Sequence, residues 1–189
     1  SFIYDKNGDQ IAEFKGSENR IYVTYDEIPQ TLINAVIAIE DARFYTHHGI
    51  DLKRIVGSLK NNLTGGNLQG ASTITCQLVK LTQLNSDQNY KRKVQEAYLA
   101  LELEEQMTKE QIMEAYLNVI YLGGANYGVK IAAQDYFGKD LSQLTLRECA
   151  CLAAVIRNPY RYNPRRNYYV FDDSHLIDDR TNYVLKEMN

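Results

Sequence analysis

Apolar residues recur at helical spacing along most of this chain, and this pattern constrains the fold more than any other feature. Capping boxes, the Ser/Thr-x-x-Glu/Gln signal that opens a helix, occur at Thr108–Gln111 and Thr145–Glu148. Glycines close two of the expected helices at Gly123 and Gly138. The alternating pattern of a strand occurs only near the start, in Tyr4–Phe14 around an Asn-Gly turn. The sequence therefore predicts a mainly α protein with a short N-terminal β-hairpin.

The expected helices can be assigned to ranges, and two of them to faces. In the helix over 90–107, Val94, Tyr98 and Leu101 are expected to point inward. In the helix over 71–84, Ile74, Leu78 and Leu81 are expected to share one face. The polar side chains of Thr73, Gln77 and Lys80 are expected to form a stripe that faces away from the core. Two prolines predict an irregular segment over Arg157–Asn167. The other helices are expected at 29–43, 51–63, 108–123, 126–137 and 145–156, with a last one around 176–184.

Composition and charge exclude several classes of protein. A hydrophobic share of 44% and a charged share of 24% are typical of a folded globular domain. The net charge of −3 gives no overall attraction to nucleic acid, so an anionic ligand must be held by a local basic cluster. No apolar run is long enough to span a membrane. Cys76, Cys149 and Cys151 form no CxxC pair and are expected to be buried, unpaired side chains.

The segment Ile39–Gly49, IEDARFYTHHG, ends an apolar helical run in two adjacent carboxylates, Glu40 and Asp41. A carboxylate in this position can accept or donate a proton, which makes Glu40 a candidate acid or base. The alternative is a helix-end acid that hydrogen-bonds to backbone or to Arg43. His47 is expected to make an orienting hydrogen bond, because adjacent histidines seldom converge on one metal.

A second cluster, YKRKVQE, sets Arg92 and Lys93 four and three residues before Glu96, so two cations and a carboxylate share a helical face. Taken alone, this is a surface ion-pair stripe of small energetic value. Lys80 lies on the preceding helix, and if the two helices are antiparallel neighbours their basic groups converge on one anion. A glycosidase, whose leaving group is a neutral hydroxyl, does not need such cations, but a transferase with a pyrophosphate leaving group does. The cluster therefore favours transfer from a phosphate-activated donor.

These residues resemble motifs of the family 51 glycosyltransferases, the peptidoglycan transglycosylases that occur alone or as the N-terminal module of class A penicillin-binding proteins. EDARFYTHHG is similar to the EDxxFxxHxG motif of that family, and four further motifs follow in order. The opening hairpin is more similar to the bifunctional members. The matching segments are Glu40–Gly49, Gly70–Lys80 (GASTITCQLVK), Arg92–Glu96 (RKVQE), Lys109–Gly123, and Ala153–Pro164 with the later Arg180.

The resemblance implies a single glycosyltransferase domain over 1–189, built as a lysozyme-like helical head with a small mobile jaw lobe at about 45–72. Residues 1–25 would form the N-terminal hairpin segment. It also implies polymerisation of lipid II into β-1,4 glycan strands, with inversion at the donor anomeric carbon and release of polyprenyl pyrophosphate. The alternatives are a lysozyme-like glycan hydrolase or lytic transglycosylase, and a module that has lost its chemistry.

Carried over to this sequence, the resemblance makes Glu40 the general base that takes a proton from the acceptor's 4-hydroxyl. Glu96 is the second catalytic carboxylate and supports the donor pyrophosphate, directly or through a divalent cation, Mg²⁺ or Mn²⁺. No organic cofactor is implied. The residues expected to bind substrate are Asp41, Phe44, His47, Ser72, Thr73, Gln77, Lys80, Arg92, Lys93 and Asn163.

The implied partners are lipid II, the growing lipid-linked glycan, the cytoplasmic membrane at its extracytoplasmic face, and phosphoglycolipid inhibitors of the moenomycin type. Any membrane anchor would lie outside this chain. The resemblance allows a C-terminal transpeptidase domain in a longer parent chain, although this chain has no SxxK serine site. Two positions depart from the family pattern: Cys76 stands where relatives usually have Gln, and Gln88 where many have Arg. Both are expected to affect donor or inhibitor affinity.

Overall fold

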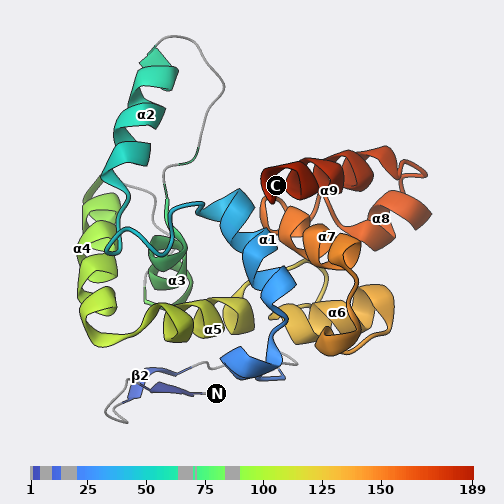
Figure 1. The fold of residues 1–189 in the computed structure, drawn as a ribbon, viewed down its shortest axis with the longest axis horizontal. Coiled ribbons are helices and arrows are strands. Elements are labelled where there is room, and N and C mark those ends of the chain that lie inside the picture. Colours follow the sequence, from blue (N-terminus) through green and yellow to red (C-terminus); the bar gives the residue numbers. More distant parts are fainter. Residues whose placement is uncertain (1, 5–9, 14–20, 64–69, 71, 84–89) are drawn as a thin grey trace. The chain divides into compact units, whose positions relative to one another are not determined.

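The structure, a computed structural model, describes residues 2–4, 10–13, 21–63, 70, 72–83 and 90–189. These residues contain nine α-helices and two short strands, which confirms the prediction of a mainly α protein (Figure 1). The chain divides into two compact units. Unit 1 comprises residues 1–14 and 43–112, and unit 2 comprises residues 15–42 and 113–189.

Unit 1 contains the two strands, three complete helices and the start of a fourth. Strands β1 and β2 pair antiparallel, with Phe2 opposite Glu13. The turn predicted at Asn7-Gly8 lies outside the described residues, so the complete hairpin stays a prediction. The elements are β1 (Phe2–Tyr4), β2 (Gln10–Glu13), α2 (Leu52–Leu63), α3 (Ile74–Thr82), α4 (Tyr90–Gln106) and the first residues of α5 (Lys109–Val119).

Helix α4 buries a different face from the one predicted. Val94, Tyr98 and Leu101 are exposed, at 71%, 64% and 41%. The buried side chains lie on nearly the opposite side of the helix, also at spacings of four and three: Glu96, Ala100 and Leu103.

The physical reason for this rotation is a close backbone approach. Gly49 has φ +80°, and a Cβ placed on it would lie 2.5 Å from the carbonyl oxygen of Ala100. The turn before α2 therefore rests directly on the backbone of α4, which requires glycine at position 49. This long-range contact accompanies burial of the face that carries Ala100 and Leu103, which the apolar pattern of α4 alone did not indicate.

Helix α3 begins at Thr73, whose side-chain oxygen accepts a hydrogen bond from the amide of Cys76 at 3.1 Å. Ile74 and Leu78 are buried as predicted, whereas Leu81 is exposed. The predicted outward polar stripe is wrong at its first residue, because Thr73 is completely buried. It caps the helix and is not a surface residue.

Unit 2 is organised around α7 (Leu146–Ile156), which packs against three other helices. These are α1 (Gln30–Glu40), α6 (Val129–Phe137) and α9 (His175–Glu187) (Figure 1). Seven residues of α7 are buried, and the predicted capping box opens it, with Thr145 Oγ1 accepting from the amide of Glu148. The predicted stop at Gly138 after α6 is also confirmed, with φ 64°.

One element of unit 2 was missed. Pro164 was expected to lie in an irregular segment, but it opens a short helix, α8 (Pro164–Tyr169). Asn163 caps this helix by accepting from the amide of Arg166 at 3.1 Å. The prediction treated proline only as a helix breaker, although proline at the first helical position is favourable because its missing N–H is not needed there. Among the helices described, none is both long and apolar enough to cross a membrane.

Candidate catalytic and donor-binding sites

Glu40 is the last residue of α1, as predicted, and its side chain is half-buried. Asp41 follows it as the C-terminal cap, with its amide donating to the carbonyl of Ile37 at 2.9 Å. The carboxylate of Asp41 is buried, at 1% residue exposure. The two adjacent acids therefore differ in access, and Glu40 is the one that a ligand can approach.

Two further side chains of unit 2 lie within electrostatic range of Glu40. Burial raises the pKa of the Tyr116 hydroxyl well above its ordinary value, and the negative charges of Glu40 and Asp41 raise it further. Burial lowers the pKa of Arg180, and so does the nearby Arg157, whereas Glu40 acts in the opposite direction. Glu40 thus shares its surroundings with a protonated phenol and with the guanidinium of Arg180.

Tyr116 and Arg157 were not among the predicted site residues. Tyr116 lies on α5, where its helical spacing marks it as a core residue, and burial at 0% exposure agrees with that. No local signal connects Tyr116 to Glu40, because α5 approaches the end of α1 only through the fold. Arg180 was matched to the fifth motif but given no role.

In unit 1, the segment Arg43–Gly49 forms a compact turn. Phe44 is completely buried, its ring lies edge-on to that of His47 with centroids 6.2 Å apart, and Lys109 Nζ lies 4.6 Å from the centre of the Phe44 ring. His47 is also buried, with Nδ1 3.8 Å from Oε1 of Glu104. Phe44 and His47 are therefore fixed parts of the turn.

The turn is joined to the start of α3. Thr73 Oγ1 donates to the carbonyl of Gly49 at 2.5 Å, and the thiol of Cys76 donates to the same oxygen at 3.6 Å. Burial raises the pKa of the Cys76 thiol, so it stays protonated and able to donate. Cys76, one of the two departures from the family pattern, thus faces the interior of unit 1. Gln88 lies outside the described residues.

The carboxylate of Glu96 is 2% exposed and ion-paired to Lys93, three residues earlier on α4. The ammonium of Lys93 also donates to Ser72 Oγ at 2.8 Å. An acid and a cation of α4 and a hydroxyl from the residue before the cap of α3 are therefore brought together, and the cation is exposed whereas the acid is buried.

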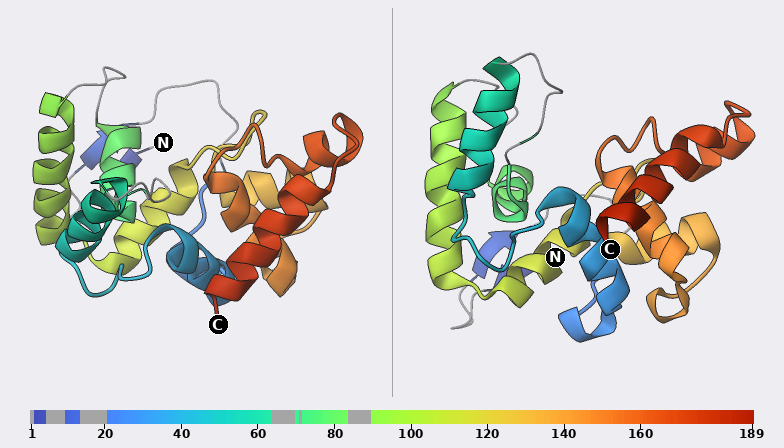
Figure 2. Two further views of the ribbon diagram at one scale, coloured as in Figure 1. Left: turned by 90° about the horizontal axis from the view of Figure 1, so that it is seen from above. Right: turned by 45° about the horizontal axis from the view of Figure 1, so that its top comes forward.

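Lys80, Arg92 and Gln77 lie on the same two helices, α3 and α4. Lys80 is exposed in the last turn of α3, and the other two are half-buried. Figure 2 (right) views α3 nearly along its axis beside α4, so the two helices cross and are not antiparallel neighbours. The condition under which Lys80 was expected to converge with Arg92 and Lys93 is not met.

Asn163, the last predicted site residue, has a structural place in unit 2. It is 6% exposed, caps α8 and donates from Nδ2 to the hydroxyl of Tyr136 at 2.9 Å. Gly123 packs against it, since a Cβ there would lie 2.9 Å from Asn163 Nδ2.

The described residues hold no group of three His, Cys, Asp or Glu side chains that could bind a metal. A divalent cation at Glu96 would therefore have one protein carboxylate and would need further oxygens from a ligand. This donor set suits Mg²⁺, which is commonly held by one or two carboxylates together with substrate phosphates.

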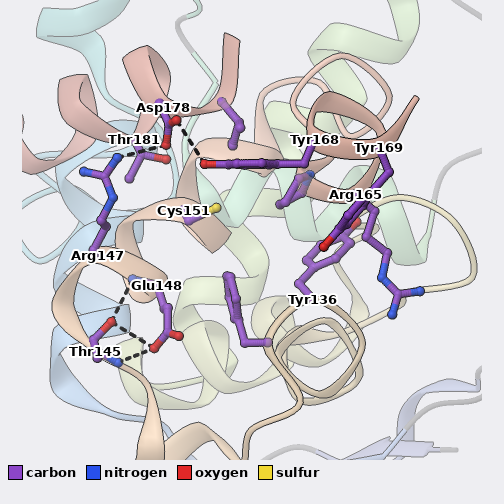
Figure 3. Close-up of a pocket in the computed structure, with 13 residues that line it drawn as sticks. Tyr136, Thr145, Arg147, Glu148, Cys151, Arg165, Tyr168, Tyr169, Asp178 and Thr181 are labelled. Atoms are coloured by element: carbon purple, nitrogen blue, oxygen red, sulfur yellow. Dashed lines mark hydrogen bonds and ion pairs between the residues drawn. The ribbon is translucent and has the colours of Figure 1, made fainter. Parts of the chain in front are cut away.

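A separate cavity of about 440 Å³ lies within unit 2. Figure 3 shows Tyr136, Tyr168 and Tyr169 around it, with Cys151 among them. Tyr168 and Arg147 both bond to Asp178, and burial raises the pKa of Cys151 to about 12, so its thiol stays protonated. None of the predicted site residues lines this cavity.

Comparison with known proteins gives one consistent result. The profile of the family described as Transglycosylase matches residues 7–189. The chain is 45% identical over its whole length to Penicillin-binding protein 1A of Streptococcus oralis, and 50% identical over 88% of its length to Penicillin-binding protein 1A/1B of Bacillus subtilis. It spans 29% and 18% of the length of these relatives. A crystal structure of Penicillin-Binding Protein 1A from Haemophilus influenzae aligns with the whole chain and 18% of that protein, at 26% identity and a TM-score of 0.47. Because the family profile covers nearly the whole sequence, this chain belongs to the transglycosylase family, the glycosyltransferases of peptidoglycan synthesis.

Proposed function

We propose that this domain polymerises lipid II into β-1,4 glycan strands and releases polyprenyl pyrophosphate. The observation that carries the proposal is the pair of acids at the family's motif positions: Glu40, half-buried at the end of α1, and Glu96, buried under Lys93. A glycosyl transfer of this kind needs a base for the acceptor and positive charge for the leaving group. Glu40 supplies the base and Lys93 the positive charge.

Glu40 acts as the general base. Its carboxylate takes the proton of the acceptor's 4-hydroxyl while that oxygen attacks the anomeric carbon of the donor chain. The bond from this carbon to the pyrophosphate oxygen breaks on the opposite face, so the configuration inverts. The guanidinium of Arg180 lies within electrostatic range of Glu40 and adds positive charge beside the proposed base.

Lys93 binds the departing pyrophosphate. Its ammonium is exposed, yet it is oriented by Glu96 and Ser72, so it can meet an anion without first being ordered. Arg92 and Lys80 contribute charge from the same two helices, and Asp41, Phe44, His47, Thr73, Gln77 and Asn163 shape the binding surface. A divalent cation held by Glu96 and the phosphates would supply further charge neutralisation.

We also propose that unit 1 contains the mobile jaw, at about 45–72, and that the helices of unit 2 belong to a lysozyme-like head. The apolar side chains Leu52, Ile55 and Val56 are exposed along one side of α2. An exposed apolar stripe on a helix suits the surface of a bilayer, which supports a location at the extracytoplasmic face of the cytoplasmic membrane. The partners are lipid II, the lipid-linked glycan and moenomycin-type phosphoglycolipids, with a transpeptidase domain in the longer parent chain.

The test is polymerisation of purified lipid II in detergent with Mg²⁺, comparing the unmodified chain, Glu40→Gln and Glu187→Gln. Glu187 is the last residue of α9, as Glu40 is of α1, and its side chain is exposed. The unmodified chain and Glu187→Gln should make glycan, and Glu40→Gln should make none. Equal activity in all three would remove Glu40 as the base. Degradation of finished peptidoglycan by the unmodified chain would favour a hydrolase instead.

A further inference from the structure

We propose that Glu104 is a positioning residue for the reaction: a buried carboxylate on α4 that holds the turn Arg43–Gly49, and with it Phe44 and His47, in place. The inference rests on the proposed function, since that function gives the turn its role at the substrate. Glu104 belongs to none of the matching motif segments.

The carboxylate of Glu104 has three polar neighbours within unit 1: Lys109, Thr75 and His47. Its side chain is 4% exposed. Lys109 Nζ lies 2.7 Å from each of its oxygens, and Thr75 Oγ1 donates to Oε1 at 2.6 Å. His47 Nδ1 lies 3.8 Å from the same oxygen. A buried charge with this many partners is costly to leave unpaired, so the groups around it are held together.

Lys109 transmits this constraint to the turn. Besides Glu104, its ammonium donates to the backbone carbonyl of His47 at 2.8 Å and lies over the ring of Phe44. If Glu104 were absent, Lys109 would lose the anion that fixes its position. The Phe44 ring and the backbone carbonyl of His47 would then each lose their contact with the Lys109 ammonium.

Thr75 transmits the constraint to the start of α3. It lies two residues after Thr73, which bonds to the carbonyl of Gly49, and three after Ser72, which accepts from Lys93. Glu104 is therefore the point where three parts of unit 1 meet: the turn, the first turn of α3 and the start of α5. The first and second of these carry residues proposed to bind substrate.

If Glu104 only stabilised the protein, its substitution would have a different experimental effect. Removing one member of a buried ion pair often destabilises a whole protein without any specific effect on a site. A positioning role predicts a local effect, confined to the segments that Glu104 contacts, together with a loss of turnover. Hydrogen exchange separates these, because it reports the opening of each backbone segment on its own.

The experiment compares the unmodified chain with Glu104→Ala, Glu104→Gln and the matched control Glu105→Ala. Glu105 is the next residue of α4, and its side chain is exposed. Amide exchange is measured across the chain by mass spectrometry, and kcat and KM are measured with lipid II. In Glu104→Ala, exchange within Arg43–Gly49 should quicken at least ten-fold with α7 unchanged, and kcat should fall at least ten-fold with a smaller change in KM. Glu105→Ala should match the unmodified chain.

Glu104→Gln keeps a hydrogen-bond acceptor for Thr75 and Lys109. It replaces Glu104→Ala in both measurements if the alanine variant does not fold. Its exchange and kcat should change in the same direction by a smaller factor. Unchanged exchange in the turn, an equal rise throughout both units, or normal kcat despite local opening would each overturn the proposal. If the unmodified chain makes no glycan, the proposed function fails, and the exchange result alone decides whether Glu104 fixes the turn.

Discussion

Gly49 is the residue where the turn of the first motif touches α4. Its φ of +80° is unfavourable for any residue with a Cβ, and a Cβ there would lie 2.5 Å from a backbone oxygen that cannot move aside. We expect Gly49→Ala to lower the free energy of unfolding by more than about 2 kcal/mol, measured by urea titration. The control is Gly57→Ala in α2, where a Cβ would meet nothing within 4 Å. Gly57→Ala should leave stability unchanged or raise it by up to about 1 kcal/mol, and an equal loss in both would contradict the close approach.

Asp51 gives the turn a pH-dependent contribution to stability. Burial of its carboxyl opposes ionisation, but hydrogen bonds from the amide of Arg54 and from the Arg43 guanidinium, with the charge of Arg43, hold its pKa below the ordinary value. A lowered pKa means that the stabilisation is present at neutral pH, above the pKa of the unfolded chain near about 4, and is lost as pH falls through the lower folded value. Asp51→Asn should therefore be less stable than the unmodified chain at pH 7, and this difference should shrink as pH falls below about 4. Urea unfolding at pH 7, 5 and 3 tests this, and a difference that is constant with pH would contradict it.

At the scale of elements, α4 offers a direct test of which face is buried. Leu101 and Leu103 lie two residues apart on this helix, and their exposures are 41% and 5%. Leu103→Ala should cost about 2–4 kcal/mol because it leaves a cavity, whereas Leu101→Ala should cost less than about 1 kcal/mol. Thermal or urea unfolding of the two variants measures the difference. A larger loss of unfolding free energy in Leu101→Ala than in Leu103→Ala would support the buried face predicted from the sequence.

Helix ends were predictable from the sequence, because the interactions that form them are local. Thr145 and Glu148, three residues apart, satisfy each other's backbone groups wherever the helix packs, and Gly138 adopts its left-handed conformation for reasons internal to the chain. The buried face of α4 was not predictable, since Ala100 carries no strong apolar signal. The backbone of Ala100 is approached closely by Gly49, which is distant in sequence.

Some features of the candidate site were likewise predictable from local sequence, and others were not. The position of Glu40 at a helix end follows from the apolar spacing of α1, and the pairing of Lys93 with Glu96 follows from their separation of three residues. The surroundings of Glu40 do not follow from any local pattern, because Tyr116 and Arg180 approach it from α5 and α9. Glu104 was missed because it is one of three glutamates in the segment ELEEQ, and such a run of charged residues is typical of a solvent-exposed helix face.

At the scale of the whole molecule, the exposed apolar residues of α2 predict binding to a membrane surface. We expect the double variant Leu52→Ser/Val56→Ser to bind vesicles of anionic phospholipid at least about ten-fold more weakly than the unmodified chain, since each side chain loses on the order of 1–2 kcal/mol of burial in the lipid. Leu146→Ser, in unit 2, is the control because Leu146 is also exposed. Co-sedimentation measures the binding. An equal loss in both would mean that the apolar stripe of α2 has no special part in it.

The boundary between the two units falls after Ala42, only two residues beyond Glu40, and the next one falls inside α5 after Ile112. The stretch 43–112 is thus an uninterrupted cassette that carries His47, Glu96 and Glu104 but not Glu40. Recombination between relatives at these two junctions would transfer Glu96 and Lys93, which are proposed to serve the donor pyrophosphate, and leave the proposed base in its original setting. The second junction is the more demanding one, because Ile112 and Met113 are both fully buried within one helix. A gene fusion at this junction succeeds only when each half of α5 packs against the buried residues of its own unit.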